Sequence, residues 1–109
     1  MVNSSEQLDL VFAALSDATR RKLLRRLAHG DFHVTELAAP HDLSLPAISK
    51  HLKVLERAGL IRRRREGSHH LIQLRTRQLR KASKWLDFYA SESWAPQLER
   101  LERLLGSAR

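Results

Sequence analysis

The first part of the chain carries short hydrophobic stripes at helical spacing, separated by residues that cap or end helices. A spacing of i, i+3, i+4 and i+7 predicts one face of a short helix, formed by Leu8, Val11, Phe12 and Leu15. A second helix is expected from Asp17 to about His29, with Ser16 as its N-cap and Gly30 at its end. Its inward positions are Leu23, Leu24 and Leu27.

Two further helices are predicted before the middle of the chain, a short third one over 36–39 and a fourth one that runs to Ala58. The residues expected to cap or close them are Thr35, Pro40, Ser44 and Gly59. Pro46 falls in the first turn of the fourth helix, where a missing N–H costs little.

The fourth helix has two chemically different faces. Its apolar face is expected to consist of Leu45, Ile48, Leu52 and Leu55. Lys50, Lys53 and Arg57 point away from Ile48, and the flanking side chains of Ala47 and Ser49 are small or can form hydrogen bonds. The helix therefore combines a dry face with a face suited to a DNA groove.

The rest of the chain predicts a β-hairpin followed by helix. Four arginines lie on the strand that enters the Glu66–Gly67–Ser68 turn, and His69 to Arg75 form the returning strand with Ile72 and Leu74 in alternation. Helical spacing then returns in two segments separated by a break near 91–93. The periodic positions are Leu79, Ala82, Leu86 and Tyr89, then Trp94, Leu98, Leu101 and Leu104.

Two short helices joined by a tight turn and followed by a basic hairpin form a winged helix-turn-helix. We expect one domain over residues 1–109, mainly α with a small β-hairpin, in the order α-α-α-α-β-β-α-α. In such a domain the second helix of the motif fits the major groove of DNA, and the hairpin reaches the neighbouring backbone or the minor groove.

The charge is concentrated on these same elements. The net charge is +8. From Ser44 to Lys84 there are twelve Lys or Arg against two acids, whereas the remaining residues hold eight basic and ten acidic ones. This distribution indicates an electrostatic footprint for phosphates. The candidate DNA-binding residues are Ser44, Pro46, Ala47, Ser49, Lys50, His51, Lys53, Arg62, Arg63, Arg64, Arg65, Ser68 and His69.

Alternatives stay open at several of these positions. A solvated surface also accounts for the lysines and for the arginines, of which alternation along a strand lets only about half face a duplex at once. His51 lies beside the apolar stripe, so packing or a local hydrogen bond is as good an interpretation as DNA contact. Arg20 and Arg21 are weaker candidates for DNA contact, because the first turn of a helix is also ordinary surface.

Three segments resemble the ArsR/SmtB family of bacterial repressors: 17–21 (DATRR), 44–55 (SLPAISKHLKVL) and 58–61 (AGLI). The resemblance extends from about Leu8 to Leu105. It implies a homodimeric repressor, with the first and last helices at the dimer interface. A two-fold axis between two recognition helices then predicts a palindromic or pseudo-palindromic operator. The expected interface residues are Leu8, Val11, Phe12, Leu15, Trp85, Tyr89, Trp94, Leu98, Leu101 and Leu104.

The chain departs from the family where metal-sensing members carry ligands. Such members place two cysteines at the start of the third helix, and here residues 33–37 read HVTEL in a chain without cysteine. Other members bind metal through Asp and His pairs on the fifth helix, and here residues 78–99 contain no histidine. We therefore expect no metal and no cofactor, because zinc-type sites need three or four nitrogen or sulfur ligands within reach. The aromatic cluster near Trp85 fits either a packed seam or a pocket for an unknown small-molecule effector.

The expected function is sequence-specific binding of double-stranded DNA by a cytoplasmic transcriptional repressor, with repression of its own gene as the first expectation. No signal peptide or membrane-spanning stretch is apparent. No enzyme is expected, since the chain lacks a Gly-rich phosphate loop and a His-Glu-x-x-His motif. The alternatives are a non-specific architectural DNA-binding protein and a protein-interaction module that uses the aromatic C-terminal face.

Overall fold

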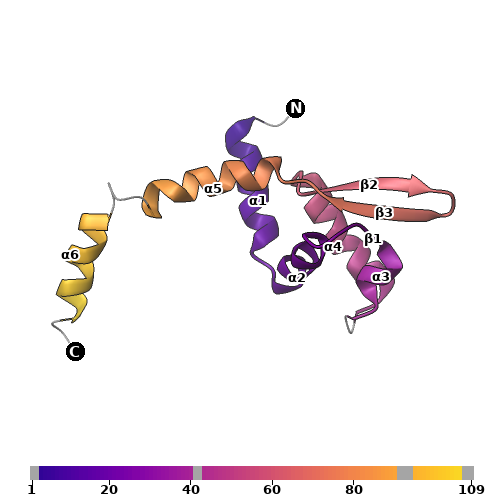
Figure 1. Cartoon of the computed structure of the whole chain (residues 1–109), viewed down its shortest axis with the longest axis horizontal. Coiled ribbons are helices and arrows are strands. Elements are labelled where there is room, and N and C mark those ends of the chain that lie inside the picture. Colours follow the sequence, from indigo (N-terminus) through magenta and orange to yellow (C-terminus); the bar gives the residue numbers. More distant parts are fainter. Residues whose placement is uncertain (1–2, 41–42, 91–94, 107–109) are drawn as a thin grey trace.

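The computed structural model describes residues 3–40, 43–90 and 95–106. A body of four helices carries a projecting hairpin at one end and a long helical arm at the other (Figure 1). The elements are α1 (Ser4–Leu15), α2 (Ala18–Leu27), β1 (Phe32–His33), α3 (Val34–Ala38), α4 (Leu45–Arg57), β2 (Ile61–Glu66), β3 (His69–Leu74), α5 (Arg77–Ala90) and α6 (Ala95–Gly106). The winged helix-turn-helix predicted from the sequence is confirmed, with one strand added.

Side-chain caps fix where the helices begin. The Ser44 cap of α4 is confirmed, because the Ser44 hydroxyl oxygen accepts from the Ala47 N–H at 3.3 Å. The prediction of Ser16 as the cap of α2 is wrong: Asp17 caps that helix, while the Ser16 hydroxyl donates to the Ala13 carbonyl at the end of α1. The Asp17 carboxylate accepts from the Arg20 backbone N–H at 3.0 Å, which satisfies an exposed N–H in the first turn of α2.

The third helix begins two residues earlier than predicted. Its N-cap is His33 rather than Thr35, and the backbone N–H of His33 donates to the Glu36 carboxylate at 2.8 Å. A carboxylate three residues after the cap satisfies the exposed N–H at a helix start, so the Glu36 side chain decides the boundary.

The hairpin belongs to a three-stranded antiparallel sheet with the strand order β1-β3-β2. Strands β2 and β3 are the predicted pair, with Ile61 opposite Leu74 and Glu66 opposite His69. Strand β1 was not predicted, because two residues carry no alternation; Phe32 pairs with Ile72 and His33 with Leu71. Strand β1 thus pairs with the middle of β3 and attaches the hairpin to the body.

One hydrophobic core joins α1, α2, α3, α4, the sheet and α5. Its largest fully buried side chains are Val11, Leu23, Leu37, Ile48, Leu52, Leu55, Leu60 and Ile72. Two predictions are corrected. Val11 is 1 % exposed and packs inside the protomer, so it cannot line a surface for a second chain. Leu45 is 51 % exposed, because the first residue of α4 lies beyond the edge of the core.

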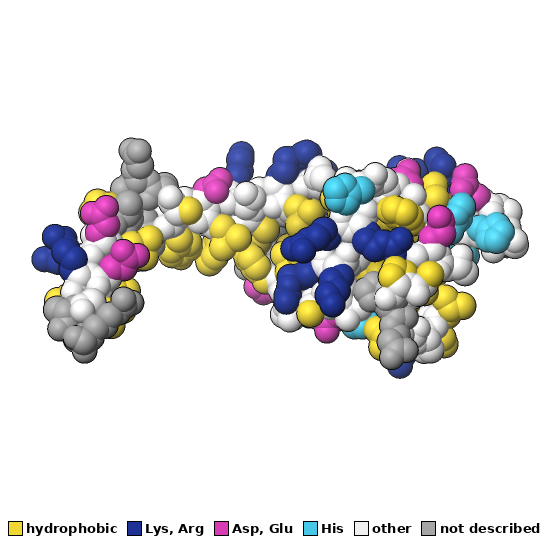
Figure 2. Space-filling model, turned by 60° about the horizontal axis from the view of Figure 1, so that its bottom comes forward, with side chains coloured by type: hydrophobic (Ala, Val, Ile, Leu, Met, Phe, Trp, Pro, Cys, Tyr) yellow, Lys and Arg dark blue, Asp and Glu magenta, His cyan; other side chains and the backbone are white. Residues whose placement is uncertain are grey.

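The last two helices, α5 and α6, form an arm that extends away from this core. The radius of gyration is 17.9 Å, against about 13 Å for a compact domain of this length. A band of hydrophobic side chains runs along α5 on the face shown in Figure 2. The exposed large hydrophobic residues of the arm are Trp85, Leu86, Phe88, Tyr89, Leu98, Leu101, Leu104 and Leu105. Within the described ranges, every helix is too short or too polar to cross a membrane.

Candidate DNA-binding surface

Helix α4 presents its basic face to solvent because its apolar face is buried in the core. Ile48, Leu52 and Leu55 are each 0 % exposed, which fixes the rotation of the helix about its axis. Lys50, Lys53 and Arg57 are consequently exposed, as the sequence predicts. Among the other candidates on this helix, Ser44 and Pro46 are exposed, and Ala47, Ser49 and His51 are half-buried.

The hairpin of β2 and β3 is the wing of this domain. Its four arginines divide between the two faces of the sheet. Arg63 and Arg65 share a face with Ile61, while Arg62 and Arg64 share the other face with Glu66. The Arg63 side chain is 22 % exposed, and its Nε lies 3.9 Å from Glu56 Oε1 on α4. Arg63 therefore packs toward the body, and Arg62 and Arg64 are the arginines of the outer face.

Two short-range contacts order the arginines nearest the tip. Arg65 Nε donates to the Gly67 carbonyl at 3.1 Å, and an Arg64 guanidinium nitrogen donates to Glu66 Oε2 at 3.4 Å. Ser68 and His69 are exposed beside them. The wing tip therefore carries both basic and acidic groups.

Helix α4, the wing and the start of α3 line an open hollow of about 410 Å³. Leu45, Pro46 and Ser49 line it from α4, and Arg63, Ser68 and His69 line it from the wing. The structure thus brings together candidate residues from two segments of the chain. Exposed Leu45, which the sequence assigned to the core, borders this hollow.

His51 takes part in a polar cluster between α2 and α4. Its Nδ1 lies 3.3 Å from an Arg20 guanidinium nitrogen and 3.8 Å from Asp17 Oδ2. The hydrogen bond from the Arg20 backbone N–H holds the pKa of Asp17 below its ordinary value, with the Arg20 guanidinium and His51 adding to the effect. His51 therefore has the local polar contact that was one of its two interpretations.

Arg20 and Arg21 hold the end of α1. Arg20 donates to the carbonyls of Ala14 at 2.7 Å and Ala13 at 3.2 Å, and Arg21 donates to that of Leu15 at 2.8 Å. These bonds help to satisfy the carbonyls in the last turn of α1, where the Ala13 carbonyl also accepts from Ser16. Both guanidinium groups are engaged by backbone carbonyls.

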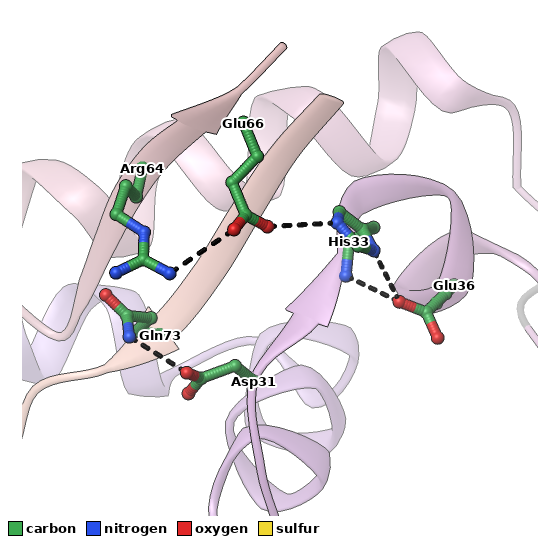
Figure 3. Close-up of polar contacts among 6 residues, drawn as sticks. All are labelled: Asp31, His33, Glu36, Arg64, Glu66 and Gln73. Atoms are coloured by element: carbon green, nitrogen blue, oxygen red, sulfur yellow. Dashed lines mark hydrogen bonds and ion pairs between the residues drawn. The ribbon is translucent and has the colours of Figure 1, made fainter. Parts of the chain in front are cut away.

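A polar network on the outer face of the sheet was missed by the sequence analysis (Figure 3). His33 lies between the carboxylates of Glu36 and Glu66, and the Gln73 amide donates to Asp31 Oδ2 at 2.8 Å. The backbone hydrogen bond from His33, followed by the one from its ring, lowers the pKa of Glu36. The i, i+3 spacing of His33 and Glu36 is the one signal in the sequence that points to this network.

The described residues contain no cluster of three or more His, Asp or Glu side chains placed to hold a metal ion.

The residues expected at the dimer interface divide between body and arm. Leu8, Phe12 and Leu15 are partly buried against the core, and the Phe12 and Trp85 rings meet edge to face at 5.6 Å. Trp85 and Tyr89 are also in ring contact at 5.0 Å, yet each is more than 40 % exposed. Leu98, Leu101 and Leu104 are exposed on α6, and Trp94 lies outside the described residues.

Comparisons with known proteins agree with this geometry. A family model described as a helix-turn-helix domain matches residues 15–64. The HTH-type transcriptional regulator Rv2034 of Mycobacterium tuberculosis is 47 % identical over 66 residues, which are 61 % of this chain and 62 % of that protein, a little under two thirds of its length. The transcriptional repressor SdpR of Bacillus subtilis is 38 % identical over 76 residues, covering 70 % of this chain and 84 % of SdpR.

A solved structure extends the likeness to nearly the whole fold. The crystal structure of an ArsR family transcriptional regulator superposes with a TM-score of 0.73 at 36 % identity, covering 94 % of this chain and 97 % of that one. Fold, charged surface and sequence relatives point the same way, and this chain belongs to the ArsR family of winged helix-turn-helix transcriptional regulators.

Proposed function

We propose that this protein is a homodimeric repressor that binds a palindromic operator through α4 and the wing. The observation that carries the proposal is the division of α4 into a fully buried apolar face and an exposed face with Lys50, Lys53 and Arg57, beside a basic hairpin. Lys and Arg side chains also gather over the helical body in the middle of the face shown in Figure 2.

The two elements have different tasks in this proposal. Exposed Lys50 and half-buried Ser49, near the start of α4, contact base edges in the major groove and set sequence preference. Arg62 and Arg64 contact phosphates or the minor groove and supply affinity that falls with salt. His51 contributes by holding α4 against α2.

A second copy of the chain covers the exposed apolar residues of α5 and α6. Large apolar patches on a soluble protein mark interaction sites, and those of the arm are continuous with the Phe12–Trp85 contact on the body. A two-fold axis through this interface would relate two copies of α4, which then read half-sites about 10 bp apart, one turn of DNA.

The test is a titration of labelled DNA from upstream of the protein's own gene, with a random duplex of equal length, at two salt concentrations. A preference of about 10³ or more for the upstream DNA supports an operator-specific repressor. Equal binding of both duplexes points to an architectural protein or to an operator elsewhere. Failure to bind either at low salt would favour a protein-interaction module.

A further inference from the structure

The wing is tied to the start of α3 by a histidine that has a carboxylate at each ring nitrogen (Figure 3). His33 Nδ1 lies 3.0 Å from Glu36 Oε1, and His33 Nε2 lies 3.4 Å from Glu66 Oε1. Strands β1 and β2 flank β3 in the sheet, so the contact with Glu66 crosses one face of the middle strand. The two residues are 33 positions apart in the chain, and the sheet register brings them together.

The number of N–H groups on the His33 ring determines how many of the two carboxylates it can bind. A neutral imidazole has one N–H and can donate to only one of the two carboxylates, while its other nitrogen presents a lone pair. An imidazolium donates to both. The neutral ring keeps Glu36, since that contact is shorter and the backbone N–H of His33 already fixes the Glu36 carboxylate at 2.8 Å. The contact that the neutral ring loses is therefore the one with Glu66.

We propose that His33 is a proton-dependent latch for the wing. The protonated ring holds Glu66 and fixes the wing tip relative to α3 and α4, and the neutral ring releases it. His33 is thus a positioning residue, and only its consequence for DNA binding rests on the function proposed above.

The neighbouring charged groups set how far the latch acts. Arg64 binds the other oxygen of Glu66 at 3.4 Å, so a released Glu66 keeps that partner. The His69 ring on β3 lies 5.5 Å from the His33 ring, centroid to centroid, on the same face of the sheet as Glu66. The Asp31–Gln73 hydrogen bond, which does not involve His33, ties the wing nearer its base. The latch therefore acts on the tip of the wing.

The size of the effect follows from exposure. The His33 and Glu66 side chains are 37 % and 45 % exposed, so the ion pair is partly screened by solvent. Exposed pairs of this kind change an equilibrium roughly two- to fivefold.

The first experiment measures the wing without DNA. Backbone ¹⁵N relaxation of residues 66–69 is recorded at about pH 5.5 and about pH 8, on either side of the range in which histidines ordinarily titrate. We expect higher order parameters at the lower pH in the unaltered protein and no such difference in Glu66→Gln. The matched control is His70→Asn, which removes a histidine from the other face of β3 and should keep the difference. An equal pH effect in Glu66→Gln, or none in the unaltered protein, would overturn the latch.

The second experiment measures the consequence for DNA. The ratio of affinities at the two pH values is compared between the unaltered protein and Glu66→Gln on one duplex. The ratios should differ roughly two- to fivefold; equal ratios would show that the latch does not position the wing for DNA. Failure to bind any duplex would count against the proposed function, and the relaxation result would still decide on the latch.

Discussion

Single polar side chains act mainly on the backbone of neighbouring helices in this molecule. Asp17 caps α2, Arg20 holds the end of α1, and Arg26 donates to the carbonyls of Glu36 and Leu37 in α3. The Arg26 guanidinium also lies 4.8 Å from the centre of the Phe32 ring. These charges therefore fix how the helices around α4 are joined.

Replacement of Asp17 by alanine should destabilise the protein by about 1 kcal/mol at neutral pH, since α2 loses its N-cap. The lowered pKa of Asp17 makes this loss depend on pH. The carboxylate stabilises the fold fully above about pH 4, the ordinary value for aspartate, and progressively less as pH falls through its folded-state pKa. Urea unfolding of both proteins at about pH 7 and about pH 3, at one protein concentration, measures the difference.

The control is Asp9→Ala, which removes an exposed carboxylate from the middle of α1 and should change stability little. If Asp17→Ala is less stable than the unaltered protein by the same amount at both pH values, the charged carboxylate has no role in the stability of the fold.

At the scale of elements, the junction between α4 and the wing depends on one residue with positive φ. Gly59 has φ +77°, and a Cβ there would lie 3.1 Å from the Gln78 side chain at the start of α5. Gly67 in the hairpin turn has φ +60°, but a Cβ there would meet open space. A substitution by alanine therefore strains the backbone at both glycines, whereas the new Cβ is crowded only at Gly59.

Gly59→Ala should therefore destabilise the protein more than Gly67→Ala. The shared backbone cost is about 1–2 kcal/mol, and the close contact with Gln78 adds to it. Thermal unfolding of the two variants side by side checks the order. Equal losses would mean that Gln78 moves aside without cost.

The two faces of strand β2 predict different outcomes for adjacent arginines. Arg62→Ala should weaken binding to all duplexes and lower the slope of log affinity against log salt by about 1, as expected for one lost phosphate contact. Arg63→Ala, on the face turned to Glu56, should leave that slope nearly unchanged. Equal slopes for the two variants would argue against the assignment of the outer face to DNA.

Lys50→Ala tests the role of α4 separately. Loss of a base contact should cost about 1–3 kcal/mol on the operator and relax specificity at that base pair, whereas binding to random DNA should change little. Competition titrations with operator and random duplexes measure both. Equal losses on the two would show that Lys50 contacts only the backbone of DNA.

At the scale of the whole molecule, a single protomer leaves the apolar side chains of the arm exposed. Leu101 on α6 is 52 % exposed, and the side chains of 96–106 are exposed in the protomer. A glutamate at such a position disturbs little within one chain but places a charge in any interface that covers it.

Leu101→Glu should shift the molecule from dimer to monomer and leave the stability of the body nearly unchanged. Sedimentation velocity over a range of concentrations measures the shift. Arg103→Glu, which places the same side chain on the opposite face of α6, is the control and should remain dimeric. A fully dimeric Leu101→Glu would place the interface elsewhere.

Local patterns in the sequence determined the order of the elements and the two faces of α4. Periodicity, caps and turn residues act within a few positions, so Ile48, Leu52 and Leu55 could be placed in the core and Lys50 outside it without knowledge of the fold. The concentration of positive charge between residues 44 and 84 also indicated the DNA-binding elements, because it can be counted along the chain without knowledge of the fold.

Only the tertiary structure decided which groups meet across the chain. The two-residue strand β1 exists because β3 offers it a partner, and the pairing of His33 with Glu66 follows from the register of three strands. The faces of Arg62 and Arg63, the burial of Val11 and the exposure of Leu45 depend likewise on where other elements lie. Such contacts depend on distances between segments far apart in sequence, which no local spacing encodes.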